Sequence, residues 1–215
     1  MKLCVDRGAV IFALGAVAIG LIGIWRGGMD ADEVASSVVN VLIVGAAALV
    51  HELGHIAVAR LCGTPIRRLR LDLFGARMDL GGWMSYRREM AVAAGGPAVG
   101  LLACMAVWPL ASNAAGKYAE SCALFVLASL TLSLLNLLPV ATLDGGRMLR
   151  CFLCGVVGER VADAVLRVTS TLVVGTLWLL SVYALLRTGE MLTIFAFSLC
   201  LLCRLVSPDA AADWW

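Results

Sequence analysis

Long apolar runs, separated by short polar stretches, dominate the pattern of this sequence. Six of them have the roughly 17–25 residues that a helix needs to cross a lipid bilayer. They cover residues 8–25, 38–61, 90–110, 118–140, 161–186 and 191–206. We therefore predict an all-α polytopic membrane protein with about six transmembrane helices, forming one domain over residues 1–215. The first run is too long for the ~7–15-residue core of a signal peptide, so we expect it to be retained as a span.

The pattern changes from helical to alternating between the second and third runs. In the segment PIRRLRLDLFGARMDLGGWMSY, residues 65–86, leucines occupy every second position around Arg70 and Asp72 before a turn at Gly75. This period of two predicts a small membrane-associated β-hairpin. A sheet edge cannot lie in lipid, so we expect it at the cytoplasmic interface or in a protein-lined cavity. Two interpretations stay open: a surface loop, or a strand edge to which an unfolded substrate segment adds through main-chain hydrogen bonds.

The composition agrees with membrane insertion. The chain is 61% hydrophobic with a mean hydropathy of +0.94, whereas a soluble domain has about 45–50% apolar residues. A net charge of +2 is too small to suggest nucleic-acid binding, and the basic residues cluster between apolar runs. We therefore expect an integral membrane protein with no nucleic-acid partner.

Arginine is concentrated in two of the loops, and this asymmetry predicts the orientation in the membrane. The loops after the second and fourth runs are rich in arginine, whereas Arg26 in the first loop is outweighed by acidic residues. Loops with an excess of arginine stay in the cytoplasm. We therefore expect these two loops, and both chain termini, on the cytoplasmic side. The arginines are Arg60, Arg67, Arg68, Arg70, Arg77, Arg87 and Arg88 in one loop and Arg147, Arg150 and Arg160 in the other.

The eight cysteines mostly lie within or beside apolar runs, where a thiol behaves as a small hydrophobic group. We do not expect a disulfide framework. Two CxxC pairs, CFLC at 151–154 and CLLC at 200–203, have the internal spacing of zinc knuckles. Their middle residues are Phe and Leu in predicted helices rather than turn-forming residues, so we do not predict a structural zinc site there.

The stretch AALVHELGHIAVARL, residues 47–61, places three ionisable side chains inside the second apolar run. Such groups cost free energy in lipid unless something pairs with them. His51 and His55 are the chain's two histidines, and at this spacing they share one helix face, where both can bind one zinc ion. Glu52 completes an HExxH motif as the general base that takes a proton from water. The weaker alternative is a hydrogen-bonded pair of core histidines beside an unrelated acid.

The position of this motif in the run predicts its depth. Val38 and His51 are separated by about 20 Å of helix at ~1.5 Å per residue, in a hydrocarbon layer about 30 Å thick. The metal would then lie below the membrane surface, toward the cytoplasmic end of the helix. Peptide hydrolysis at this depth needs water, so we expect a polar cavity that opens to the cytoplasm.

Two imidazoles leave a catalytic zinc one protein ligand short of the usual three. Asp144, in the segment NLLPVATLDGGRML, follows an apolar run and precedes two glycines. Its alternative role is to cap a helix that begins with Arg147. With the HELGH motif present, ligation is the better hypothesis. Pro139 disfavours helix at Leu138, so the chain is expected to leave helical geometry before it reaches Asp144.

At these two motifs the sequence resembles the site-2 proteases, the zinc metalloproteases that cut within or beside the membrane. The short build, without an inserted PDZ or CBS module, looks most like the branch of the bacterial stage IV sporulation protein FB. The resemblance implies that His51, His55 and Asp144 bind zinc and that Glu52 is the general base. It also implies that Asn136 orients the substrate or stabilises the oxyanion, as a neutral amide donor can.

The sequence departs from the family pattern at two positions. Thr142 stands where a second proline is frequent, and Gly100 stands where an asparagine is common, at the end of the segment AGGPAVG, residues 94–100. Neither residue is a proposed ligand, so the departures bear on the substrate groove and on the branch. For this glycine-rich segment, close helix packing through small residues is preferred over direct catalysis.

The hypothesis is a zinc-dependent intramembrane endopeptidase in a bacterial cell membrane that hydrolyses a membrane-associated segment of a substrate protein. The resemblance implies a transcription-factor precursor or an anti-sigma factor as the substrate, and a membrane regulatory partner is conceivable. The rival is a divalent-metal transporter with His and Glu on membrane helices, which would be expected to show duplicated halves that this sequence lacks. A third alternative, a non-catalytic adaptor that binds membrane segments, is disfavoured by an intact Glu52.

Overall fold

The computed structural model describes residues 2–5, 30–64, 66–72, 75–80, 84–113, 115–188 and 192–206. The chain divides into two compact units. The first unit comprises Met1–Met84 and Gly95–Ser133, and the second comprises Ser85–Ala94 and Leu134–Trp215. Each unit is described by itself below.

The long helix of the first unit is α2, Ala31–Leu61. It begins where the backbone N–H of Asp30 donates a hydrogen bond to the Glu33 carboxylate at 3.2 Å, which compensates one unpaired donor of the first turn. After its last residue, Leu61, the chain turns at Gly63, whose φ of 69° is a conformation that favours glycine. There the backbone N–H of Thr64 donates to the carbonyl of Ala59 at 3.0 Å.

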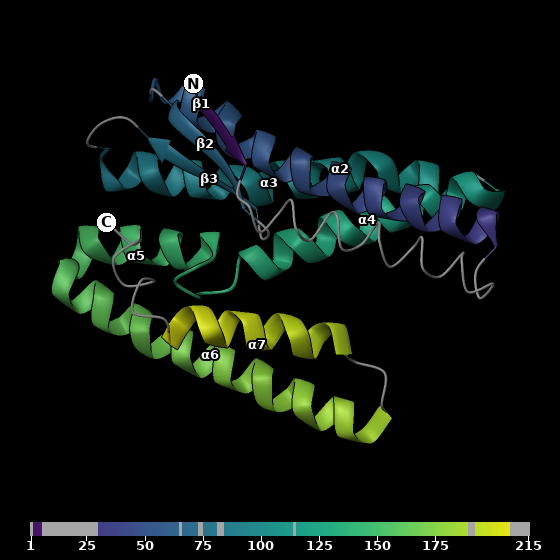
Figure 1. The fold of residues 1–215 in the computed structure, drawn as a ribbon. Coiled ribbons are helices and arrows are strands. Elements are labelled where there is room, and N and C mark those ends of the chain that lie inside the picture. Colours follow the sequence, from purple (N-terminus) through teal and green to yellow (C-terminus); the bar gives the residue numbers. More distant parts are fainter. Residues whose placement is uncertain are drawn as a thin grey trace. The chain divides into compact units, whose positions relative to one another are not determined.

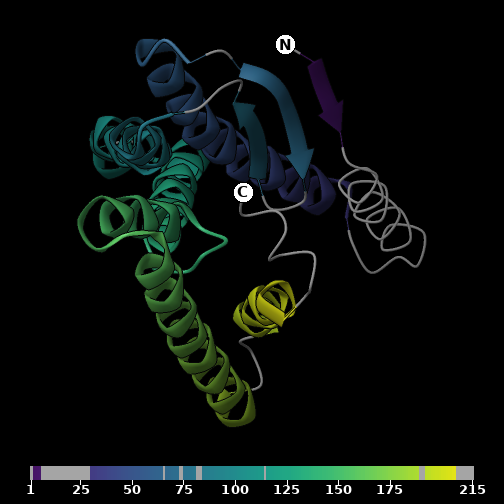
Figure 2. The same ribbon diagram turned by 90° about the vertical axis from the view of Figure 1, so that its left-hand side faces the viewer.

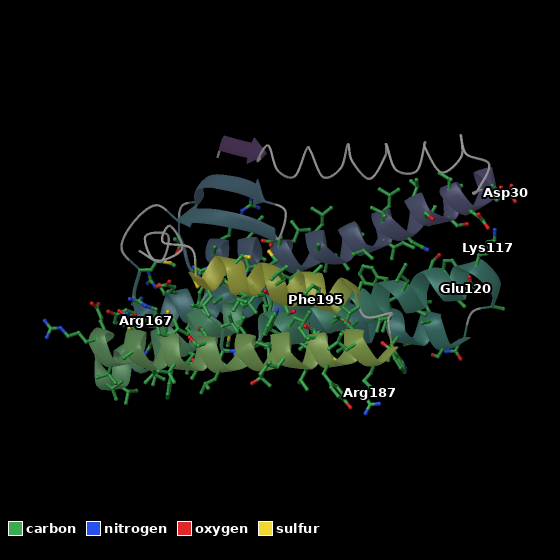
Figure 3. All side chains as sticks on the ribbon, turned by 60° about the horizontal axis from the view of Figure 1, so that its bottom comes forward. Asp30, Lys117, Glu120, Arg167, Arg187 and Phe195 are labelled. Carbon is green, nitrogen blue, oxygen red and sulfur yellow. The ribbon has the colours of Figure 1, made fainter. Side chains whose placement is uncertain are left out.

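Two further helices complete the helical part of the first unit. Helix α3, Tyr86–Asn113, contributes its residues from Gly95 onward, and helix α4, Gly116–Asn136, contributes its residues up to Ser133. Figure 3 shows Asp30, Lys117 and Glu120 at the same end of this unit. Helices α2 and α4 therefore both begin at that end. The charged helix ends and the apolar middle match the pattern expected of membrane spans.

Helices α2 and α3 approach closely at two glycines. A Cβ added to Gly95 would lie 2.7 Å from the carbonyl oxygen of Gly54 and 2.9 Å from Cγ2 of Val58. A Cβ added to Gly54 would in turn meet the carbonyl oxygen of Gly95. Backbones can come this near only through small residues, which is the usual way that helices pack in membranes. The glycine of HELGH and the first glycine of the AGGP segment are therefore packing residues, as the sequence predicted for the latter.

The first unit also contains a three-stranded sheet of order β1-β2-β3 (Figures 1 and 2). Strand β1, Lys2–Val5, runs parallel to β2, Ile66–Asp72, and β2 pairs antiparallel with β3, Gly75–Leu80. The register places Leu69 opposite Met78, with an irregularity between Ile66 and Arg68. The alternating segment therefore does not stand alone, because a strand from near the N-terminus is its third member.

The second unit is built from α5, Asp144–Val157, α6, Glu159–Thr188, and α7, Leu192–Val206, together with the first residues of α3. Helices α5 and α6 are joined at Gly158, whose φ is 87°. Figure 2 shows α6 leading away from α5. Val140, Val174 and Leu201 form a buried apolar cluster where the loop before α5, helix α6 and helix α7 meet.

The predicted fold class is wrong as stated. In the described parts of the chain, four helices rather than six are long and apolar enough to cross a membrane: Asp32–Leu61, Tyr86–Asn113, Gly116–Asn136 and Glu159–Thr188. The first predicted span, residues 8–25, lies outside the described residues. The sixth coincides with α7, whose 15 residues fall short of the roughly 17–25 that a span needs. The predicted all-α fold with one hairpin is corrected to helices with a mixed three-stranded sheet.

The helix crossing predicts the outcome of a single substitution. Gly95→Ala places a methyl group against the backbone of Gly54, which cannot move away as a side chain would, so we expect a loss of about 1–3 kcal/mol in the free energy of unfolding. The measurement is thermal or detergent-induced unfolding of the purified protein. Gly45→Ala on α2 is the matched control, because a Cβ there meets nothing within 4 Å. Equal stability of the two variants would contradict the crossing.

Candidate metal centre

The two histidines of HELGH lie one turn apart on α2 and are almost completely buried. His51 is 3% exposed and His55 is 6% exposed. Their ring centroids are 5.0 Å apart in an edge-to-face arrangement, and their ligand nitrogens lie within 4.8 Å of each other. Glu52 follows His51 on the same helix and is half-buried. The spacing predicted from the sequence therefore brings two buried imidazole donors together on one helix face, as a shared metal ligand pair requires.

Helix α3 places Gly96 directly against the two imidazoles. A Cβ added to Gly96 would lie 2.7 Å from Nε2 of His51 and closer still to the ring of His55. The backbone N–H of Gly96 also donates a long hydrogen bond, 3.3 Å, to Nδ1 of His55. Any side chain at this position would occupy the space into which both Nε2 atoms face. The AGGP segment therefore does more than pack helices, and the sequence analysis missed this role of its second glycine.

The predicted end of α4 before Asp144 is confirmed. Helix α4 ends at Asn136, and an irregular loop of residues 137–143 leads to α5. Pro139 lies in this loop, where its missing N–H and fixed φ interrupt the helix. Asn136 is half-buried as the last residue of α4. The loop and Asn136 belong to the second unit.

Asp144 is the first residue of α5 and is half-buried. Leu143 occupies the N-cap position, and no side chain makes a capping hydrogen bond there. Helix α5 starts at Asp144 rather than at Arg147, whose backbone N–H already bonds to the carbonyl of Leu143 at 3.2 Å. Asp144 is therefore not the N-cap residue of α5, and the expected helix start at Arg147 is wrong.

The two glycines after Asp144 allow the loop to fold back on the start of α5. A Cβ on Gly145 would meet the carbonyl oxygen of Leu138 and the backbone of Leu137, and a Cβ on Gly146 would meet the backbone of Val140. These contacts are with backbone, which has no freedom to yield. The DGG sequence is thus needed for the position of the Asp144 backbone and not for flexibility.

A buried serine holds the same loop from α6. The backbone N–H of Ala141 donates to Oγ of Ser170 at 2.9 Å, and Ser170 is 0% exposed. Within the loop, the N–H of Leu143 donates to the carbonyl of Val140 at 2.8 Å. Ser170 was not singled out from the sequence, because a lone serine in an apolar helix carries no local signal of its partner thirty residues away.

The cysteine pair on α5 does not have the chemistry of a zinc knuckle. Cys151 and Cys154 are buried in the helix rather than placed on a turn. Burial raises the pKa of the Cys151 thiol to about 12, with a further contribution from the Glu89 carboxylate, and burial also raises the pKa of Cys154. Cys200 and Cys203 likewise lie within a helix, α7.

Comparison with known proteins connects this geometry to peptidases. Residues 111–180 match the model of Peptidase family M50. The putative zinc metalloprotease Rip3 of Mycobacterium tuberculosis is 37% identical over 114 residues, which are 50% of this chain and 29% of the relative. Stage IV sporulation protein FB of Bacillus subtilis is 34% identical over 103 residues, 47% of this chain and 35% of the relative. This chain thus spans about a third of the length of these relatives.

A solved structure shares the fold. The site-2 protease from Methanocaldococcus jannaschii superposes with a TM-score of 0.64 at 18% identity, covering 93% of this chain and 86% of that chain. At this low identity the likeness concerns the architecture and not the individual residues. That protein therefore shares the fold of this chain.

The hydrogen bond between the loop and Ser170 predicts that the Ser170→Ala variant is less stable than the wild type. The variant leaves the Ala141 N–H without its acceptor in a part-buried position, which costs about 1–3 kcal/mol. We expect faster amide hydrogen exchange at Ala141 and Leu143, together with a lower unfolding temperature. Thr171→Ala is the control, since that hydroxyl is exposed and bonds within its own helix to the carbonyl of Arg167. Unchanged exchange in the loop would show that Ser170 does not hold it.

Proposed function

We propose that this chain, which is similar to peptidase family M50 over residues 111–180 and to zinc metalloproteases over about half of its length, is a zinc-dependent intramembrane endopeptidase. It hydrolyses a peptide bond within or next to a membrane-associated segment of a substrate protein. The observation that carries the proposal is the pair of buried imidazoles one turn apart, with Glu52 between them, on a helix long enough to span a bilayer. The resemblance found in the sequence is confirmed by the matches to zinc metalloproteases.

The residues fit one zinc ion. The imidazoles of His51 and His55 are buried, their donor atoms are close, and Gly96 leaves the space beside both Nε2 atoms without a side chain. We assign Asp144 as the third protein ligand, because a catalytic zinc needs a third protein donor and the Asp144 carboxylate offers one oxygen atom. Two histidines and one carboxylate are a familiar ligand set of catalytic zinc. When bound, zinc supplies a Lewis acid that polarises the scissile carbonyl and lowers the pKa of water.

Glu52 is the general base in this proposal. Its carboxylate accepts a proton from the attacking water as the oxygen adds to the carbonyl carbon, and returns that proton to the departing amine nitrogen when the C–N bond breaks. The products are a carboxylate and an amine. Asn136 donates an amide N–H to the substrate carbonyl, which orients the peptide and stabilises negative charge as it develops on the oxygen.

The substrate is a membrane-associated protein segment. A helical carbonyl is shielded by its own hydrogen bond, so the segment must unwind before cleavage, and residues that weaken a helix are favoured near the cleaved bond. We place the site toward the cytoplasmic side and both termini in the cytoplasm, because the arginine-rich loops are expected there. Regulated proteolysis of a transcription-factor precursor or an anti-sigma factor, under a membrane regulatory partner, is the process that we assign to it.

Glu52→Gln separates proteolysis from metal binding. The variant keeps the ligands and should retain zinc at the wild-type ratio, while cleavage of a co-expressed membrane substrate falls at least about 100-fold, since general base catalysis contributes about 10²–10⁴-fold. Metal analysis and the appearance of the cleaved fragment are the two measurements. Glu120→Gln, an exposed glutamate on α4, is the control that should leave both unchanged. Unchanged cleavage by Glu52→Gln would contradict the mechanism, and loss of zinc uptake into vesicles would instead favour a transporter.

Asp144→Asn tests the third ligand. Because a neutral amide is a much poorer zinc ligand than a carboxylate, we expect zinc affinity to fall by more than the about 10–100-fold that is lost with an outer-shell partner. Competition with a chelator of known affinity measures the change in the purified protein. Asp32→Asn, an exposed acid in the first turn of α2, should bind zinc as the wild type does. Full zinc affinity in Asp144→Asn would remove this residue from the ligand set.

A further inference from the structure

The hydroxyl of Ser133 is one of two buried hydroxyls on α4, with that of Ser129, that the proposed chemistry leaves unexplained. Ser133 is 0% exposed, and its Oγ has no hydrogen-bond partner among the described residues. It lies on the buried face of α4 with Cys122, Val126 and Ser129. A buried hydroxyl without a partner costs free energy that an alanine would not. Such a group therefore calls for a partner that is present in the working protein.

Gly100 lies close to both this hydroxyl and His51, and no hydrogen bond joins the two side chains in this structure. A Cβ added to Gly100 would meet Oγ of Ser133 at less than a contact distance, and it would lie 3.7 Å from Nδ1 of His51. The space over the Gly100 backbone is thus shared by the serine hydroxyl and one imidazole nitrogen. All three residues belong to the first unit, on α4, α3 and α2.

The two nitrogens of His51 face successive turns of α3. Nε2 lies beside Gly96, where Nε2 of His55 also faces, whereas Nδ1 lies beside Gly100, one turn further along. Nε2 is therefore the nitrogen on the side of the second imidazole, and Nδ1 is the nitrogen on the side of Ser133. A histidine that binds zinc through one ring nitrogen usually donates the N–H of the other nitrogen to a fixed acceptor.

We propose that Ser133 is the positioning residue of His51: when Nε2 binds the metal, Oγ of Ser133 comes to accept a hydrogen bond from Nδ1–H of His51. The hydrogen bond selects the tautomer whose Nε2 lone pair is available and holds the ring in the plane that the metal requires. This inference rests on the proposed zinc site and adds the residue that orients one of its ligands. Gly100 contributes to the same arrangement, because the Cβ of any other residue there would displace the Ser133 hydroxyl.

The test is the zinc affinity of Ser133→Ala, measured on the full chain in detergent by competition with a chelator. We expect zinc to bind about 10–100-fold more weakly, as is typical when an outer-shell partner is removed. The unfolding temperature of the metal-free variant should not fall, since the substitution removes a hydroxyl without a partner. Ser129→Ala is the matched control: it is also buried on the same face of α4 and also lacks a partner among the described residues, but it is not among the atoms nearest Gly100.

A spectroscopic signature separates orientation of His51 from simple packing. The chain has two histidines, so nitrogen-15 labelling of histidine yields few ring signals, which His51→Ala assigns. In the zinc-loaded wild type, the Nδ1–H proton of His51 should be shifted downfield and protected from exchange, and in Ser133→Ala this protection should be lost. In Ser129→Ala it should remain.

The outcomes distinguish this inference from the proposed function. If the wild type binds no zinc, the proposed function fails. If the wild type binds zinc and Ser133→Ala binds it equally tightly, or Ser129→Ala loses as much affinity, only the positioning role fails. Should Ser133→Ala not fold, Gly100→Ala in the wild-type background displaces the hydroxyl instead, and the same weakened zinc binding and unprotected Nδ1–H are expected. Unchanged zinc binding and Nδ1–H protection in Gly100→Ala would overturn the inference.

Discussion

The close approach of the α2 and α3 backbones at Gly54 and Gly95 is the constraint on which the rest of the first unit depends. At this distance, the next residue of α3, Gly96, lies against both imidazoles, and Gly100 reaches the far nitrogen of His51 one turn later. A helix pair held apart by ordinary side chains would put α3 too far away to shape the space around the histidines. Glycine is therefore repeated along one face of α3 for two reasons: packing of backbones and room for the imidazoles.

Buried polar groups in an apolar setting explain the composition of this region. His51 and His55 are nearly inaccessible, and groups of this kind persist in membrane helices only when a partner compensates the cost of burial. In the proposed function, a bound cation would provide that compensation for the histidines, and a hydrogen bond to His51 would provide it for Ser133. The same physical requirement, a partner for each buried polar group, thus accounts for the proposed ligands His51 and His55 and for the buried hydroxyl of Ser133.

In the second unit, a short irregular loop is held in place between helices. The loop of residues 137–143 exposes backbone groups that a helix would have paired. The hydroxyl of Ser170 accepts a hydrogen bond from one such group, the backbone N–H of Ala141. The glycines at 145 and 146 let the loop fold back without a steric clash. Pro139 forces the helix to end, but it does not by itself determine where the chain goes next. The start of α5 at Asp144 follows from these contacts together.

The sequence by itself determined the placement of His51 and His55 on one face of a helix and the end of α4 before Asp144. The spacing of His51 and His55 is read within one turn of a single helix, and the effect of Pro139 is confined to its neighbours, so both could be predicted locally. The tertiary structure decided the contacts of Gly96, Gly100 and Ser170, and the pairing of β1 with β2. Of the five predicted spans that lie in the described residues, four are long and apolar enough to cross a membrane. Each of these contacts depends on partners far apart along the chain, for which no local periodicity exists.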